Sequence, residues 1–182
     1  KSQTDQFVRA PLQCQAASSL VTIGDQRGLD HLREALKVLD PETHPLETAN
    51  ALANEGRFHH LAGRHKKAIE LLTRAAELVA PAAVAETVTT QEASIITMLY
   101  GYLAGAYQHS GLFSDGDVWA HKSGEFGTAH NIPFAQALGL EYLGENAMNR
   151  GEFADGLNYA MREREIAERI HSRERRGWTH MC

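Results

Sequence analysis

Histidine is the residue type in this chain with the widest range of possible chemistry. The sequence contains ten histidines, and His59, His60 and His65 form the tightest group. Neutral imidazole is a common zinc ligand, but a helical zinc pair usually has two histidines four residues apart. His59 and His65 are six residues apart across a turn, so we assign them to different helices. Tyr107 and Phe113 have the same separation, which favours packing over metal binding.

Glu141 and Glu145 form the acidic pair whose spacing could support general acid–base chemistry. They lie four residues apart in one predicted helix and therefore share a face. No nucleophile–base pair accompanies them, so we predict no catalytic residues and no enzyme, and we predict no metal or cofactor. Two interpretations of the pair remain open: a solvated helix face, which is the commoner one, and an acidic patch for a basic ligand.

Charge and composition exclude several classes of protein. The formal net charge is −5, which does not indicate a surface that neutralises nucleic-acid phosphates, and the ten charges between Arg162 and Arg176 are mixed in sign. The longest apolar stretch, Ala93 to Ala106, is interrupted by serine, threonine and glycine, so we predict no membrane span. Cys14 and Cys182 give no disulfide framework, which fits the cytoplasm.

Repeated glycines predict the elements that carry these residues. Gly63 and Gly111 are 48 residues apart, Gly111 and Gly151 are 40 apart, and counting back 40 from Gly63 ends beside Gly24. Apolar residues recur at helical spacing between them, as in Leu29, Leu32, Leu36 and Leu39. The chain is therefore predicted to consist of helical units that bury their apolar faces against their neighbours.

The pattern predicts eight helices, and glycine and proline mark their ends. The expected ranges are 8–23, 26–39, 46–62, 65–79, 87–110, 113–129, 134–150 and 153–170. Pro41 and Pro81 are expected to end helices, whereas Pro45 and Pro133 are expected near a first helical turn. The turn glycines are expected to adopt positive φ. A ninth helix is expected from about Ser172.

The segment Asn50–Pro81 resembles a tetratricopeptide repeat. The matching positions are the small residues Gly56, Ala68 and Ala75, the helix-ending Pro81, and His59 and His65, which stand where the family usually has tyrosine. The resemblance implies an all-α fold, a right-handed α-solenoid of about four antiparallel helix hairpins. It covers the chain as a single array, 1–182. The units are roughly 8–41, 46–81, 87–130 and 134–171, and 172–182 is the start of a further helix.

The repeat period is longer than the family's usual 34 residues. It is similar to that of arrays in large bacterial signalling and transcription-regulator proteins, where such arrays follow a regulatory ATPase module. No GxxxxGK[ST] phosphate loop occurs in this chain. The chain begins with Lys1 and not with Met, and it ends at Cys182 shortly after Gly177 and Trp178, so we expect it to be a fragment of a larger protein, in which it forms the regulatory or sensor array.

The resemblance implies a non-catalytic scaffold that binds a protein or peptide, or another domain of the parent protein. First helices of such repeats usually line a concave groove. The residues expected there are Asn50, Arg57, His60, Arg64, Gln108, His109, Glu141, Glu145 and Asn149. The second unit is basic and the fourth is acidic. The positions equivalent to the family's carboxylate-clamp pair do not reproduce that clamp.

Two alternatives stay open at this stage. One is a sensor that binds a small-molecule effector inside the superhelix, with His60, Gln108 and His109 as polar contacts. The other is a spacer or a homodimerisation module. The long apolar sector that includes Met98, Tyr102 and Tyr107 is expected to be mostly core, with one or two residues exposed in the groove.

Overall fold

The computed structural model describes Cys14, residues 17–21 and residues 23–170, in which helix is the only regular secondary structure. The helices are α2 (Gln26–Leu36), α3 (Pro45–Leu61), α4 (His65–Ala83), α5 (Thr90–Gln108), α6 (Phe113–Ala129), α7 (Pro133–Arg150) and α8 (Phe153–Arg169). Residues 17–21 are also helical. The fold is all-α, as predicted. The predicted helix at 8–23 lies largely, and the one from Ser172 entirely, outside the described residues.

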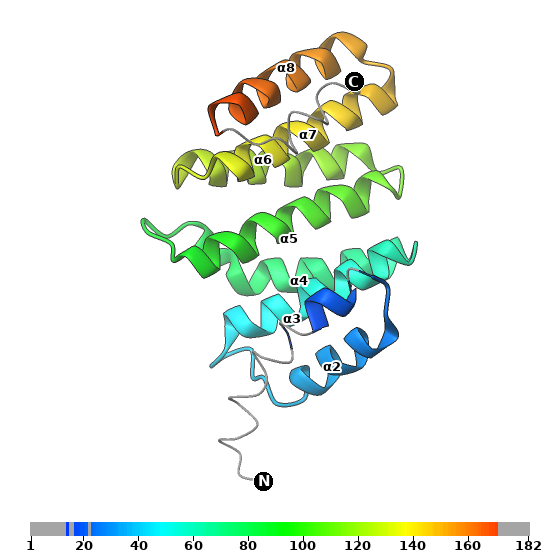
Figure 1. Cartoon of the computed structure of the whole chain (residues 1–182), viewed down its shortest axis with the longest axis vertical. Helices are drawn as coiled ribbons and strands as arrows, with labels where there is room; N and C mark the ends of the chain where they lie inside the picture. Colours follow the sequence, from blue (N-terminus) through cyan, green and yellow to red (C-terminus); the bar gives the residue numbers. More distant parts are fainter. Residues whose placement is uncertain (1–13, 15–16, 22, 171–182) are drawn as a thin grey trace.

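The helices follow one another in chain order along the long axis of the molecule (Figure 1). Each helix from α2 to α8 packs against the next one in the chain. The odd-numbered helices also pack against each other, α3 against α5 and α5 against α7. The pairs α4–α6 and α6–α8 make little or no contact. We call the side formed by α3, α5 and α7 the closed side of the stack, and the side formed by α4, α6 and α8 the open side.

The four turn glycines share one backbone conformation, which confirms the sequence prediction. Their φ values are 72° for Gly24, 72° for Gly63, 75° for Gly111 and 80° for Gly151. After α3, the N–H of Gly63 donates to the carbonyl of His60 (2.9 Å) and the N–H of Arg64 donates to that of His59 (2.8 Å). The same pair of hydrogen bonds recurs at the other three glycines. Glycine serves here because positive φ costs it no steric energy.

Proline marks the helix starts as predicted, but neither of the two helix ends expected at proline falls there, since α2 already stops at Leu36, before Pro41. Pro45 and Pro133 lie in the first turns of α3 and α7. Pro81 was expected to end its helix, yet α4 continues through it to Ala83. Proline lacks one backbone N–H, so it removes one helical hydrogen bond. Pro81 lies in the last turn of α4, and the helix ends two residues after it.

The start of α5 also differs from the prediction of a helix from residue 87. Thr89 is the N-cap: its hydroxyl accepts from the N–H of Glu92 (3.2 Å), and the Glu92 carboxylate accepts from the N–H of Thr89 (2.7 Å). This capping box satisfies donors that the first helical turn leaves unpaired. At the other end of the array, α2 stops at Leu36, three residues short of the predicted end.

The α6–α7 contact is a backbone-to-backbone approach. A Cβ added to Gly139 of α7 would lie 2.5 Å from the carbonyl oxygen of Ala120 and 2.9 Å from the nitrogen of Gly124, both in α6. A Cβ added to Gly127 of α6 would lie 2.6 Å from the nitrogen of Gln136. These positions accept no side chain unless the two helices move apart.

Large apolar side chains fill the space where consecutive helices meet. Leu72, Ile96, Leu99 and Leu103 are fully buried, and they belong to a cluster that extends from α3 to α7. Within α3 and α5 nearly every residue of the middle turns is buried, since α3 packs against three other helices and α5 against four. No described helix has both the length and the apolar character needed to cross a membrane.

The close approach of α6 and α7 predicts opposite effects for two glycine substitutions. Gly139→Ala should lower the free energy of unfolding by about 1–3 kcal/mol, because backbone atoms of α6 obstruct the new methyl group. Gly124→Ala should be neutral or stabilising by up to about 1 kcal/mol, because its Cβ would meet nothing within 4 Å and alanine favours helix. Urea denaturation measures both, and equal effects would contradict this packing.

Candidate functional site

Polar side chains form a row across α3, α5 and α7, the three helices on the closed side of the stack. The guanidinium of Arg57 in α3 lies 5.4 Å from the ring centroid of Tyr102 in α5. His60 of α3 contacts His109, which follows α5, with ring centroids 5.0 Å apart. Gln108 of α5 donates from Nε2 to the Glu145 carboxylate of α7 (2.9 Å). We call these residues, with His65 added below, the polar row.

Three imidazoles meet at one point of the polar row. His65, the first residue of α4, lies 5.3 Å from His60 and 5.7 Å from His109 between ring centroids. The histidine cluster therefore consists of His60, His65 and His109, and not of the three histidines closest in sequence. His109 joins from 44 residues beyond His65, through the packing of α5 against α3.

The cluster disfavours protonation of its innermost member. Burial, followed by the charges of His109 and His65, lowers the pKa of His60 from 6.5 to about 4. The buried Nδ1 atoms of His60 and His65 have no hydrogen-bond partner among the described residues. Nδ1 of His109 lies 2.7 Å from the carbonyl oxygen of Gly105, which indicates that this nitrogen carries the proton. At neutral pH His60 is therefore an uncharged imidazole with an unused nitrogen.

His59 lies apart from the cluster and is part of the core. It is 7% exposed, and its Nε2 lies 3.9 Å from the Glu55 carboxylate. Burial is the main reason why its pKa is lowered, and the charge of Arg64 adds to the effect. A packing role fits this position, in line with the sequence interpretation.

In the α5–α7 half of the polar row, two glycines of α5 leave room for side chains of α7. Gly101 lies under the side chain of Leu138, and Gly105 lies under the ring of Tyr142. Gln108 is only 8% exposed, so it bridges the two helices from within the contact. Glu145 is half-buried beside it.

The remaining residues expected in the groove lie at the margins of the polar row. Asn50 of α3 is half-buried, and its side-chain oxygen accepts from Asn54 of the same helix (3.0 Å). Arg64 is exposed at the start of α4 and lies 5.4 Å from the Phe58 ring centroid. Glu141 is half-buried in α7, and Asn149 is exposed at the end of that helix.

Aromatic residues on this side of the stack were only partly expected. In the apolar sector of α5, Leu99, Tyr100 and Leu103 are buried, while Met98, Tyr102 and Tyr107 are half-buried. Tyr142 of α7 was not predicted. It lies 40 residues after Tyr102, one repeat interval on, so the spacing carried a signal that could have found it.

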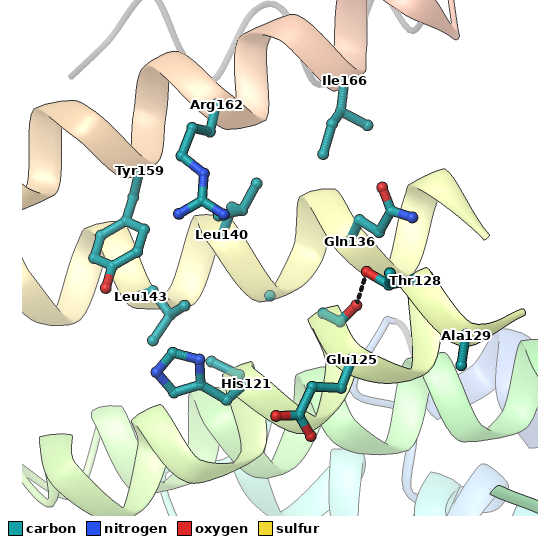
Figure 2. A pocket seen from close by; sticks show the side chains of 13 residues that line it. His121, Glu125, Thr128, Ala129, Gln136, Leu140, Leu143, Tyr159, Arg162 and Ile166 are labelled. Carbon is teal, nitrogen blue, oxygen red and sulfur yellow. Dashed lines mark hydrogen bonds between the residues drawn. The ribbon is translucent and has the colours of Figure 1, made fainter. Parts of the chain in front are cut away.

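The open side of the stack contains a groove between α6 and α8 (Figure 2). Its volume is about 530 Å³, and Leu140 and Leu143 of α7 lie beneath it. Tyr159 and Arg162 of α8 lie on one side, and the polar side chains of α6 lie on the other (Figure 2). The mixture of apolar and polar groups suits a small ligand.

The α6–α8 groove has two counterparts of nearly equal size. A groove of about 570 Å³ lies between the end of α4 and α6, and one of about 540 Å³ lies between α2 and α4. Arg74, Lys122 and Arg162 occupy the three grooves and are spaced by 48 and 40 residues, the glycine intervals. The grooves therefore follow from the repeat, and their volume alone does not identify a ligand site.

Metal binding finds no support in the described part of the chain. There, no three or more histidine, cysteine, aspartate or glutamate side chains are arranged so that they could hold a metal ion. What the polar row does offer is imidazole nitrogens and a guanidinium at its α3–α5 part and carboxylates on α7. These groups suit polar and charged contacts with a partner.

No protein-family model matches the chain, and no curated protein matches it. The function is therefore argued from the polar row and the grooves themselves.

Acid should weaken the fold through His60. The folded-state pKa of about 4 lies below the ordinary 6.5, so the unfolded chain binds this proton more readily. The group costs no stability above about pH 6.5, and stability falls as the pH drops from 6.5 towards 4. His60→Phe keeps a ring without the titration, so its urea midpoint should fall less over that range than the wild-type midpoint.

His121→Phe, at an exposed position of α6, is the matched control and should keep the wild-type pH dependence. If His60→Phe and the wild type lost stability in parallel between pH 6.5 and 4, His60 would not be the responsible group.

Proposed function

We propose that this chain is a non-catalytic scaffold, a right-handed α-solenoid of tetratricopeptide-like hairpins that binds a protein segment along the polar row. The observation that carries the proposal is the row itself, which crosses three successive odd-numbered helices. In it Arg57 lies over Tyr102, His60 lies against His109, and Gln108 donates to Glu145. In this proposal, the row faces the partner.

The packing pattern supports a curved array with the odd-numbered helices inside. These helices contact each other, whereas α4, α6 and α8 scarcely do, and a stack that is closer on one side bends towards that side. Small residues allow the close crossing within each unit. A Cβ on Gly56 would lie 3.4 Å from the Ala68 carbonyl oxygen, and one on Gly116 would lie 3.2 Å from that of Ala104.

The charges along the polar row determine which charged groups a partner segment needs, and in which order. Arg57 and the histidine cluster lie at the α3–α5 part, and Glu141 and Glu145 lie on α7. A segment with acidic groups at one end and basic groups at the other would match this order. In the larger protein that we infer, a bacterial signalling protein, the segment belongs either to another molecule or to another domain.

Charge reversal in the row tests the proposal. Peptides selected from a random library against the wild-type chain should bind the double variant Arg57→Glu, Glu145→Arg at least about tenfold more weakly, equivalent to about 1.4 kcal/mol. Fluorescence anisotropy with labelled peptides gives the affinities. The matched control, Glu125→Arg with Arg162→Glu, reverses two charges in the α6–α8 groove.

The control variant should retain wild-type affinity within about twofold. Loss of binding in the control, with the row variant unaffected, would move the binding site to the open side and contradict the proposal.

A small-molecule effector in the α6–α8 groove is the second candidate function. His121, Glu125, Tyr159 and Arg162 around apolar Leu143 favour it. A ligand of this groove should raise the melting temperature with concentration in the wild type and not in Arg162→Ala. The polar row remains the better supported site, because the groove recurs along the repeat.

A further inference from the structure

Packing alone does not account for the histidine cluster. The residues one repeat interval after His60, His65 and His109 are Gln108, Phe113 and Asn149, counted by 48, 48 and 40 positions. The equivalent positions of the junction between α5, α6 and α7 therefore hold one aromatic residue and no histidine. Three imidazoles at the α3–α4–α5 junction are more than the repeat requires.

No described carboxylate forms an ion pair with His60, His65 or His109. Glu55 of α3 lies 3.6 Å from Arg33 and 3.9 Å from His59, and at the start of α4 Glu70 is bonded to Lys67 (2.8 Å). On the α7 side, Glu145 accepts from Gln108. The charges that act on His60 are those of the other two imidazoles.

The surroundings of the cluster are positively charged. Arg57 and Arg64 lie over aromatic rings, and neither forms an ion pair with a described carboxylate. The first turn of α4 continues from His65 with Lys66 and Lys67 and contains no acid. The positive end of the α4 helix dipole adds to this field. An anion placed at the α3–α4 side of the cluster would meet these favourable charges.

We propose that the histidine cluster binds a carboxylate side chain of the partner segment, and that this binding takes up a proton. The inference rests on the proposed function and specifies the acidic end of the partner. Nδ1 of His60 and Nδ1 of His65 are buried, so the Nε2 side of each ring is the one that can donate to a carboxylate oxygen when the imidazole is protonated. The proton comes from solvent and no covalent bond changes.

Proton uptake follows from the charges that face the cluster. The free cluster disfavours an imidazolium because His60 is buried and faces two other imidazoles. The cations that flank the cluster are Arg57, Arg64 and the two lysines of α4, and the acids on α7 are Glu141 and Glu145, of which Glu145 accepts from Gln108. A bound carboxylate adds the missing negative charge and stabilises the imidazolium. Affinity should therefore rise as the pH falls through the usual range of histidine.

Two blocked peptides provide the probes: acetyl-hexaglutamate amide and, as the neutral match, acetyl-hexaglutamine amide. We expect hexaglutamate to bind the wild-type chain at least about tenfold more tightly at pH 6 than at pH 8, because a bound carboxylate raises the imidazole pKa above the value of about 4 that His60 has in the free chain, so that binding takes up a proton. Hexaglutamine should bind at least about tenfold more weakly at pH 6. In NMR spectra, hexaglutamate should shift the imidazole Cε1–H signals of His60, His65 and His109 and leave that of His121 in place.

Variants separate the cluster from general charge effects. His60→Phe and His109→Asn should each reduce hexaglutamate affinity at pH 6 by at least about fivefold, while the control His121→Phe should leave it unchanged. Circular dichroism confirms that each variant is folded, and the two cluster variants probe the site independently. Equal binding of both peptides, or unchanged affinity in both cluster variants, would overturn the inference.

The experiment also distinguishes this inference from the proposed function. If selected peptides lose affinity for Arg57→Glu, Glu145→Arg but hexaglutamate leaves the three imidazole signals unmoved, the polar row is the binding face and the histidine cluster is not its carboxylate site. If neither probe responds, the proposed function fails together with the inference.

Discussion

The close approach of consecutive helix backbones is the constraint on which the rest of this structure depends. At the α6–α7 crossing, atoms of Ala120 and Gly124 occupy the space that a side chain on Gly139 would need. Gly56 and Gly116 play a related part within their units. The turns after α3, α5 and α7 share a left-handed glycine, and the turn between α6 and α7 has Asn131 at a φ of 52°. These turns and the close crossings together produce a regular stack.

A regular stack has two different sides, and each side has its own chemistry. On the closed side, α3, α5 and α7 are near enough for Arg57 to reach Tyr102 and for Gln108 to reach Glu145. On the open side, the even-numbered helices stand apart and leave three similar grooves. The closed side collects residues that differ from unit to unit, whereas the grooves repeat. Specific recognition is therefore better supported on the closed side.

Burial gives the polar row its electrostatic character. An imidazole that is partly removed from water and faces other imidazoles holds a proton poorly, which is why the pKa of His60 is lowered. The Arg57 guanidinium rests on the face of the Tyr102 ring and not on a carboxylate. The α3–α5 part of the row is thus short of negative charge, while carboxylates lie on α7. This asymmetry is the basis for the acidic and basic ends proposed for the partner.

The sequence by itself determined the helices and their turns, because glycine spacing, proline placement and apolar periodicity act locally. Gly63, Gly111 and Gly151 adopt the positive φ that was expected of them, and Pro45 and Pro133 begin helices. Local rules were less reliable at helix ends: Pro81 did not stop α4, because the lost hydrogen bond fell in a turn that was already ending. The capping box of Thr89 and Glu92 was readable but was missed.

Only the tertiary structure decided which side chains meet. Sequence proximity grouped His59 with His60 and His65, yet His59 turned into the core and His109 took its place in the cluster. Gln108, expected as a surface contact, became a buried bridge to Glu145. Such pairs depend on how far α3 is rotated and shifted against α5, and α5 against α7. That geometry comes from the packing of every crossing between them, and no local pattern in the chain encodes it.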